Sequence, residues 1–302
     1  MESRSLRRGQ LYALAAMAIW STNYMFGRLL RDAVTPATIS AFRAVVAGLP
    51  LAVWVLTTQR VPRPARPGPV LRSLIGLGFL GIFASQYLTY LALHWSLATN
   101  VIILNAASPL VTAGLSIAAG LTMFSRGVFA GMAISVVGAA LVVALGTSGG
   151  ARLELDPGAL LVIATMVTWG LYNLGVQRLS RDLPPLAITA GAMLGGFPFL
   201  AAALLIERPP HLLATVWAHL PVLLYLSIGS SAVAYACWNA AVRDIGAEHA
   251  MMFNNVLPIF GMLLGGLVLH ERITIVQVLA SGLIIGGILI AVRSMPLYAA
   301  RD

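Results

Sequence analysis

The stretch AIWSTNYMFGRLLRD, residues 18–32, recurs in altered form as VTWGLYNLGVQRLSRD at residues 167–182. When the two stretches are aligned, Trp20 meets Trp169, an Asn follows three or four residues later, and both stretches end in Arg-Asp. A likeness of this density indicates an internal repeat, with a spacing close to 149 residues. What kind of molecule is repeated follows from the composition of the chain.

The composition is that of an integral membrane protein. Of the 302 residues, 59% are hydrophobic and only 10% are charged, and the mean hydropathy is +0.88. Soluble domains carry about 25% charged residues. The net charge of +9 comes from nineteen basic residues, all of them Arg, which lie mostly in short gaps between apolar runs. This placement favours contact with anionic membrane lipid and excludes nucleic acid as a partner.

The sequence contains no pattern typical of an enzyme or of a cofactor site. The motifs HExxH and GxSxG and the P-loop are absent, and the single Cys237 allows neither an intrachain disulfide nor a Cys-based metal site. The run GLGFLG at residues 76–81 fits a dinucleotide fingerprint, but it lies inside an apolar span with no strand before it. We therefore expect no enzyme activity, no metal and no cofactor, and we interpret these glycines as close helix packing.

Ten apolar runs are long enough to cross the hydrocarbon core of a bilayer as helices. We interpret the first run as a retained helix and not a signal peptide, because its repeat partner lies in mid-chain. The runs do not alternate in the manner of β-barrel strands. They cover residues 10–30, 36–57, 70–93, 97–120, 125–146, 157–179, 184–206, 218–242, 247–269 and 274–293.

The arginines predict the orientation of these spans. Thirteen fall on the side of the N-terminus, five fall on the other side, and Arg43 lies within a span. The positive-inside rule then places both termini in the cytoplasm, in a multi-pass protein of the inner (plasma) membrane.

The repeat and the odd number of spans together predict an inverted architecture. Each unit has five spans, so the second unit enters the membrane upside down relative to the first. The correspondence continues downstream, where Asn105 matches Asn254 and Pro109 matches Pro258. We predict an all-α membrane fold of two inverted five-helix repeats, at residues 1–146 and 157–302, joined by a linker at residues 147–156. Inverted repeats are typical of alternating-access carriers whose substrate site lies near the midplane.

The C-terminal stretch AEHAMMFNNVLPIFGMLLGGLVLHERITIVQVLASGLIIGGILIAV, residues 247–292, resembles the signature of the drug/metabolite transporter superfamily, EamA family. The stretch FRAVVAG at residues 42–48 is similar to the second helix of that family, with Arg43 at its basic position. Thr122 departs from the pattern, since it stands where the first repeat would carry Glu. The resemblance implies a ten-helix transporter of small metabolites, closest in general character to exporters of aromatic amino acids. The residues of the signature are Pro258, Glu271, Arg272, Thr274, Gly282, Gly286 and Gly287.

Polar and aromatic residues within the spans are the candidates for a substrate site, because such groups usually face the bundle interior. The alternative is that Trp and Tyr form interfacial belts and that Asn pairs helices structurally. Trp20 and Trp169 lie about ten residues into their spans, too deep for a belt. The candidate substrate-binding residues are Trp20, Asn23, Tyr24, Gln86, Tyr90, Asn105, Trp169, Tyr172, Asn173, Tyr235, Trp238, Asn239, His249 and Asn254.

Three of the candidate positions allow two interpretations. Pro109 and Pro258 each free a backbone carbonyl one turn earlier, which would serve either gating or a merely structural kink. His249, at the start of the ninth span, is either an interfacial residue or a titrating group near the pathway.

None of the ten acidic residues lies deep in a span: Glu2, Asp32, Glu154, Asp156, Asp182, Glu207, Asp244, Glu248, Glu271 and Asp302. Carriers coupled to ions, and carriers of lipophilic cations, usually need a buried carboxylate. We therefore expect a uniport-like exporter of small metabolites, with aromatic or large apolar amino acids as the favoured substrates. The alternatives are a nucleotide-sugar or other metabolite exchanger, a proton-coupled drug or metabolite efflux carrier, a channel, and an intramembrane enzyme. A monomer is favoured, and the oligomeric state stays open.

Overall fold

The computed structural model describes residues 2–30, 32–58, 67–95, 101, 104–121, 125–145, 157–268 and 274–294. Within these residues the chain is helical and contains no strand. Five helical stretches are long and apolar enough to cross a membrane, and three shorter apolar helices accompany them. The all-α membrane architecture predicted from the sequence is confirmed.

The first half of the chain supplies the helices of the first repeat. Their bounds are α1 (Glu2–Leu30), α2 (Pro36–Thr58), α3 (Pro67–Leu77), the π-helix η1 (Gly78–Ser85), α4 (Gln86–Trp95), α6 (Ser108–Ala118) and α7 (Arg126–Leu145). The first helix begins eight residues before the predicted span, so that its basic first turns extend the helix beyond the apolar segment.

The second half repeats this series of helices. Their bounds are α8 (Pro157–Leu179), α9 (Pro185–Glu207), α10 (Leu212–Ala218), α11 (Leu220–Tyr225), the π-helix η2 (Leu226–Val233), α12 (Ala234–Ile245), α13 (Ala247–Met252), the 3-10 helix η3 (Phe253–Val256), α14 (Leu257–Val268) and α15 (Ile275–Ser294).

Four predicted spans are not continuous α-helices; in the fourth, a turn at residues 106–107 precedes α6. The third and eighth spans each contain a π-helical segment, η1 and η2, which begin 148 residues apart. The ninth span is divided by the 3-10 segment η3. Such changes of helix type are frequent at functional sites, because they turn side chains and backbone groups away from a regular ladder. The segments η1 and η2 lie at equivalent positions in the two repeats, and hydropathy alone does not predict them.

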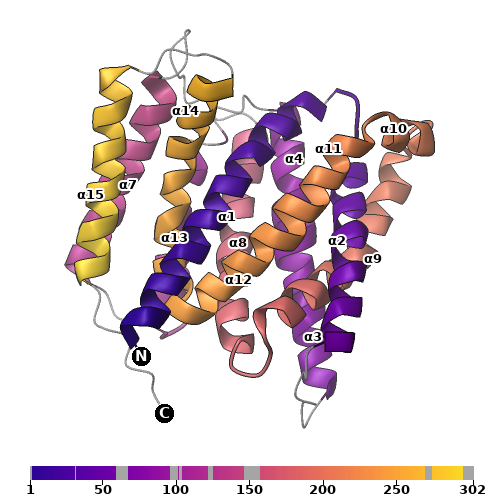
Figure 1. Ribbon diagram of the computed structural model, residues 1–302, viewed down its shortest axis with the longest axis horizontal. Helices are drawn as coiled ribbons and strands as arrows, with labels where there is room; N and C mark the ends of the chain where they lie inside the picture. The colour runs from indigo at the N-terminus through magenta and orange to yellow at the C-terminus, as the bar shows by residue number, and fades with distance from the viewer. Residues whose placement is uncertain are drawn as a thin grey trace.

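Helix packing follows the inverted repeat. The equivalent helices α2 and α9 pack on each other, as do α7 and α15. In addition α1 packs against α12, while α8, the counterpart of α1, packs against α4. Figure 1 shows α7 and α15 together at one edge of the bundle and α2 and α9 near the other. α1 begins and α15 ends on the same face, which we call the N-terminal side (Figure 1).

Glycines bring α7 and α15 close together. A Cβ on Gly131 would lie 2.5 Å from the Gly287 carbonyl oxygen, and one on Gly138 would lie 2.8 Å from the Ala280 carbonyl oxygen. Gly287 is the repeat counterpart of Gly138, and Ala280 is that of Gly131. The contact of Gly131 with Gly287 thus corresponds to the contact of Ala280 with Gly138, so a two-fold rotation that relates the repeats exchanges the two contacts.

The other glycines of the sequence analysis divide into two groups. Gly78 and Gly81 approach the Gly196 backbone and the Tyr172 ring, so the packing interpretation of GLGFLG holds for them. A Cβ on Gly282 or Gly286 would have no described atom within 4 Å, so the structure assigns no packing role to these two positions of the signature.

Candidate substrate site

A cavity of about 80 Å³ lies inside the bundle where the two repeats meet. Eight of the fourteen candidate residues line it, together with five residues that the sequence analysis did not select as substrate-binding. The lining residues are Trp20, Asn23, Arg43, Ser85, Gln86, Thr89, Tyr90, Asn105, Thr165, Trp169, Tyr235, Asn254 and Leu257. Pockets that hold drug-sized ligands measure about 300–1,000 Å³. In this conformation the cavity therefore has room for a few waters, and a larger molecule needs side-chain or helix movement.

Aromatic rings form one wall of the cavity. The Trp20 ring centre lies 5.6 Å from that of Trp169, 5.2 Å from that of Tyr235 and 5.4 Å from that of Trp238. The Trp20 indole N–H donates a hydrogen bond of 2.9 Å to the Ser230 carbonyl oxygen in η2. Edge-to-face and tilted pairs at these distances are favourable arrangements of aromatic rings. The Tyr235 hydroxyl likewise donates to the Gly81 carbonyl oxygen at 3.2 Å. The polar groups of Trp20 and Tyr235 are thus bonded within the protein, and their rings present apolar faces to the cavity.

Two repeat-related pairs touch each other at the cavity. Trp20 and Trp169 are counterparts, and so are Asn105 and Asn254, whose side-chain Nδ2 lies 3.4 Å from the Asn105 carbonyl oxygen. A residue can meet its own counterpart only near the axis that relates the repeats. The cavity therefore lies on the pseudo-two-fold axis, where a carrier of inverted repeats has its substrate site.

Arg43 is the cationic residue of the cavity, and only 1% of its surface is exposed. Its Nε donates to Ser231 Oγ at 2.9 Å, and its Nη1 donates to Asn23 Oδ1 at 3.0 Å and to the Tyr90 hydroxyl. Its guanidinium carbon lies 5.7 Å from the centre of the Tyr90 ring. The sequence signal for this residue was a single Arg within an apolar run.

Four candidates lie outside the cavity in a layer of their own: Tyr172, Asn173, Trp238 and Asn239, each 0% exposed. We call them the sealed layer. Trp238 Nε1 donates to Asn173 Oδ1 at 2.6 Å, and the Tyr172 hydroxyl donates to Asn239 Oδ1 at 3.0 Å. Asn173 and Asn239 lie six residues before the ends of α8 and α12, and both helices end on the N-terminal side (Figure 1). This layer thus separates the cavity from the N-terminal side.

One hydrogen bond recurs in the two repeats with its partners exchanged. The Tyr90 hydroxyl donates to Asn23 Oδ1 at 2.9 Å, and the Tyr172 hydroxyl donates to Asn239 Oδ1 at 3.0 Å, with the same separation of 67 residues along the chain. The structural counterpart of Asn23 is therefore Tyr172. The two Asn residues that follow Trp20 and Trp169 in the sequence, Asn23 and Asn173, are therefore not counterparts, because they differ by one position in the repeat.

The cavity and the sealed layer differ in charge. The repeat counterpart of Arg43 is Ala192, which is fully buried in α9. In its place, Asn239 Nδ2 donates to Thr189 Oγ1 at 2.9 Å. The cavity thus contains a fixed positive charge, whereas the hydrogen bonds of the sealed layer join neutral side chains.

The remaining candidates lie as follows. Pro109 and Pro258 are each the second residue of a new helical segment, α6 and α14, so each lies at a helix break and does not kink a continuous helix. His249 is half-buried in α13 and does not line the cavity. The side chain of Tyr24 lies outside the described residues.

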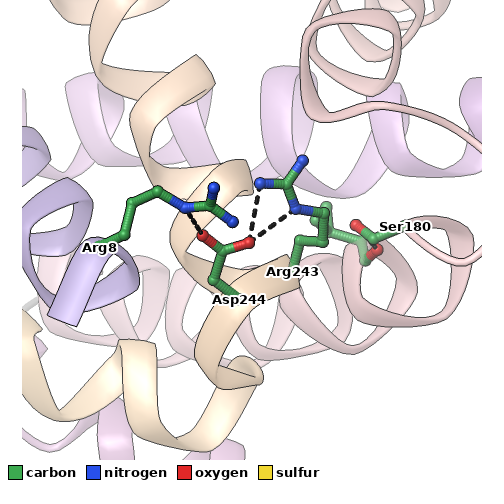
Figure 2. A network of polar contacts seen from close by, with 5 residues as sticks. Arg8, Ser180, Arg243 and Asp244 are labelled. Carbon is green, nitrogen blue, oxygen red and sulfur yellow. Dashed lines mark hydrogen bonds and ion pairs between the residues drawn. The ribbon is translucent and has the colours of Figure 1, made fainter. Parts of the chain in front are cut away.

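An ion pair joins the beginning of α1 to the end of α12 (Figure 2). Arg8 Nε lies 2.7 Å from Asp244 Oδ2, and Arg243 Nη2 lies 2.8 Å from Asp244 Oδ1. Only 3% of the Asp244 side chain is exposed, while the Arg8 side chain is 53% exposed. The pair connects the two repeats directly beyond the sealed layer.

Known proteins resemble this chain along most of its length. A probable amino-acid metabolite efflux pump of Salmonella typhimurium is 23% identical and aligns over 95% of both chains. The Escherichia coli K12 protein of the same description is 22% identical over the same shares. The uncharacterized transporter YyaM of Bacillus subtilis strain 168 is 24% identical, over 89% of this chain and 88% of the relative.

A solved structure titled only "Crystal structure of protein" has the same fold, with a TM-score of 0.77 and 20% identity over 95% of this chain and 97% of that one. The EamA-like transporter family matches the chain twice, at residues 7–144 and at residues 156–293. Together the two matches cover most of the sequence, and their spacing is that of the repeat. The chain therefore belongs to the EamA-like transporter family.

Proposed function

We propose that this transporter exports amino acids with large apolar side chains, or metabolites of such amino acids, across the inner membrane by alternating access. The observation that supports this most directly is the cavity on the pseudo-two-fold axis, with an aromatic wall and several amides. The two relatives described as probable amino-acid metabolite efflux pumps support the same substrate class. The general likeness of the chain to the aromatic amino acid exporter YddG of this family points in the same direction.

The cavity chemistry suits an amphipathic substrate. A ring or large apolar group would pack against Trp20, Trp169 and Tyr235. Asn105 and Asn254 face the same space. Gln86 Oε1 is buried with no hydrogen-bond partner among the described residues, so it can accept a bond from a bound molecule. One chain supplies both repeats and the whole lining, so a monomer is sufficient for this mechanism.

The conformation supports alternation between two closures. In our proposal the repeats at residues 1–146 and 157–302 rearrange around the axis, and both termini are cytoplasmic. The sealed layer and the ion pair of Arg8 with Asp244 then close the cytoplasmic side. The hydrogen bond between Tyr90 and Asn23 is the repeat equivalent of the bond between Tyr172 and Asn239, and it is also formed in this conformation.

The substrate site is tested by truncating its aromatic wall. Trp20→Ala and Trp169→Ala should each reduce the uptake of labelled phenylalanine into proteoliposomes, since each removes a ring pair worth about 0.5–1.5 kcal/mol beyond buried area. Trp217→Ala is the matched control, because Trp217 is 71% exposed on α10. If all three variants transport equally well, the cavity is not the substrate site.

We further propose that flux follows the substrate gradient without ion coupling. A carrier returns faster when loaded, so preloaded substrate should accelerate the entry of label, while an imposed proton or sodium gradient should leave the accumulation plateau unchanged. Accumulation that is driven by a pH step and abolished in His249→Ala would establish the proton-coupled alternative in its place.

A further inference from the structure

Arg43 carries a buried charge that no acidic side chain of the cavity balances. Its described hydrogen-bond partners are the neutral oxygens of Ser231, Asn23 and Tyr90. None of the thirteen described residues that line the cavity is acidic. A guanidinium stays protonated inside proteins, so the charge cannot be relieved by losing a proton.

A buried charge at this depth is costly unless an opposite charge accompanies it. Neutral oxygens and the Tyr90 ring compensate only part of the lost hydration. Arg43 Nη2 has no hydrogen-bond partner among the described residues, although the residue is 99% buried and lines the cavity. Two donors of the fork are therefore left for a molecule in the cavity.

The ligand that fits these donors is a carboxylate. The two free N–H groups are both on Nη2 and point in different directions, so each donates separately to an oxygen of the ligand. A hydrogen bond from guanidinium to an ionised oxygen is stronger than one to a neutral oxygen, which favours an anionic ligand. Phosphate also binds arginine, but the described lining contributes a single cation. Its wall of Trp20, Trp169, Tyr235 and Leu257 favours a ligand with an apolar group beside the anion.

The same cavity has little to bind an ammonium group. The described lining holds no carboxylate that could pair with an ammonium group, and the charge of Arg43 repels a second cation. A zwitterionic amino acid brings no net charge to neutralise Arg43, whereas a deaminated or N-acylated derivative brings one full negative charge.

We propose that Arg43 binds the carboxylate of the substrate, and that the cavity prefers monoanionic carboxylic acids with an aromatic or large apolar group over the corresponding zwitterionic amino acids. This inference rests on the proposed function in that it assigns the ligand of the same cavity. It makes Arg43 a residue that determines specificity.

The test uses three ligands that share one skeleton. Binding of 3-phenylpropanoate, L-phenylalanine and phenethylamine to the purified full-length chain is measured by titration calorimetry. We expect 3-phenylpropanoate to bind tightest and phenethylamine weakest. Arg43→Gln should weaken the binding of 3-phenylpropanoate roughly ten- to hundredfold, because a hydrogen bond to a charged group is lost. Arg72→Gln is the control, since Arg72 is exposed on α3 and should leave all three affinities unchanged.

A second variant keeps Arg43 in place, in case its removal prevents folding. Gln86→Glu is nearly isosteric and places a carboxylate in the cavity, so it should abolish the preference for 3-phenylpropanoate over phenylalanine. Equal affinity of the unaltered chain for 3-phenylpropanoate and phenylalanine, or unchanged anion binding in a folded Arg43→Gln variant, would overturn the inference.

Transport measurements separate this inference from the proposed function. If 3-phenylpropanoate binds as expected but none of the three ligands shows counterflow in proteoliposomes, the carrier proposal fails and the anion site stands. If phenylalanine shows counterflow and 3-phenylpropanoate does not compete with it, the carrier proposal stands and the anion preference is wrong.

Discussion

Trp238 shows how a single buried donor supports the closed side of the bundle. The residue is fully buried, and its indole N–H donates to Asn173 Oδ1, whose own Nδ2 donates to the Trp169 carbonyl oxygen at 2.8 Å. In this series of hydrogen bonds, each polar side-chain group has a partner in the next residue. Removing one donor leaves a buried acceptor without a hydrogen bond, and this lowers the free energy of unfolding.

We predict that Trp238→Phe destabilises the protein by about 1–3 kcal/mol, the cost of an unsatisfied buried acceptor. Thermal unfolding in detergent should show a lower Tm. Trp54→Phe provides the comparison, because Trp54 is 60% exposed on α2 and should shift the Tm little. Equal shifts in both variants would show that the Asn173 hydrogen bond contributes nothing.

At the scale of elements, glycines of α7 and α15 differ in whether they contribute to the packing of these two helices. Gly131 faces the partner helix, where a Cβ would lie 2.5 Å from the Ala291 nitrogen, whereas a Cβ on Gly282 would meet no described atom within 4 Å. The same residue type thus serves close packing at one position and only lowers helix propensity at the other.

Gly131→Ala should therefore cost about 1–3 kcal/mol through overpacking. Gly282→Ala should be neutral, or stabilising by up to about 1 kcal/mol, because alanine favours the helix. Thermal unfolding of the two variants in the same detergent measures the difference. Destabilisation by Gly282→Ala as large as that by Gly131→Ala would contradict the packing at this crossing.

The ion pair of Arg8 with Asp244 joins α1 to α12 on the N-terminal side, and in our proposal it helps to keep that side closed. Because Arg8 is half-exposed, its loss should shift the balance of open and closed states only a few-fold. In a Cys237→Ser background, Arg8→Gln should increase the alkylation rate of a cysteine at Ala13, which is fully buried on α1 five residues after Arg8. Arg7→Gln alters an exposed neighbour on the same helix and should leave that rate unchanged. If both variants react at the same rate, the ion pair does not contribute to closure.

At the scale of the whole molecule, the inverted repeats place successive loops on opposite sides of the membrane. Ser180 follows α8 on the N-terminal side, and His211 precedes α10 on the other side (Figure 1). In a Cys237→Ser background, His211→Cys should react with a membrane-impermeant maleimide in intact cells. Ser180→Cys should react only after the cells are permeabilised. Labelling of both cysteines from the same side would contradict the orientation inferred from the arginines.

Sequence reasoning predicted the elements well and their internal structure poorly. The predicted span at residues 157–179 coincides with α8, because a long apolar run between polar segments defines a helix locally. The same hydropathy describes η1, η2 and the α13–α14 break as ordinary helix. A π or 3-10 turn depends on what approaches the backbone from a neighbouring helix, as Gly196 approaches Gly78.

Much of the candidate site could be read from residue types alone. Amides and aromatic rings within apolar runs are rare, so eight of the candidates that line the cavity stood out in the sequence. Which candidates meet the cavity could not be read. Asn23 and Asn173 both follow a Trp in repeat-related helices, yet the first lines the cavity and the second is buried outside it.

The order of residues by itself determined that this protein crosses a membrane as two inverted repeats, because hydropathy and repeat spacing are properties of the chain before it folds. Only the tertiary structure decided where charge and water-accessible space lie between the repeats. Arg43 and Ala192 are repeat counterparts, but the contacts of Arg43 with Asn23, Tyr90 and Ser231 come from three other helical segments. The energy of a buried charge depends on hydrogen-bond partners that are far away in sequence, and hydropathy contains no information about these partners.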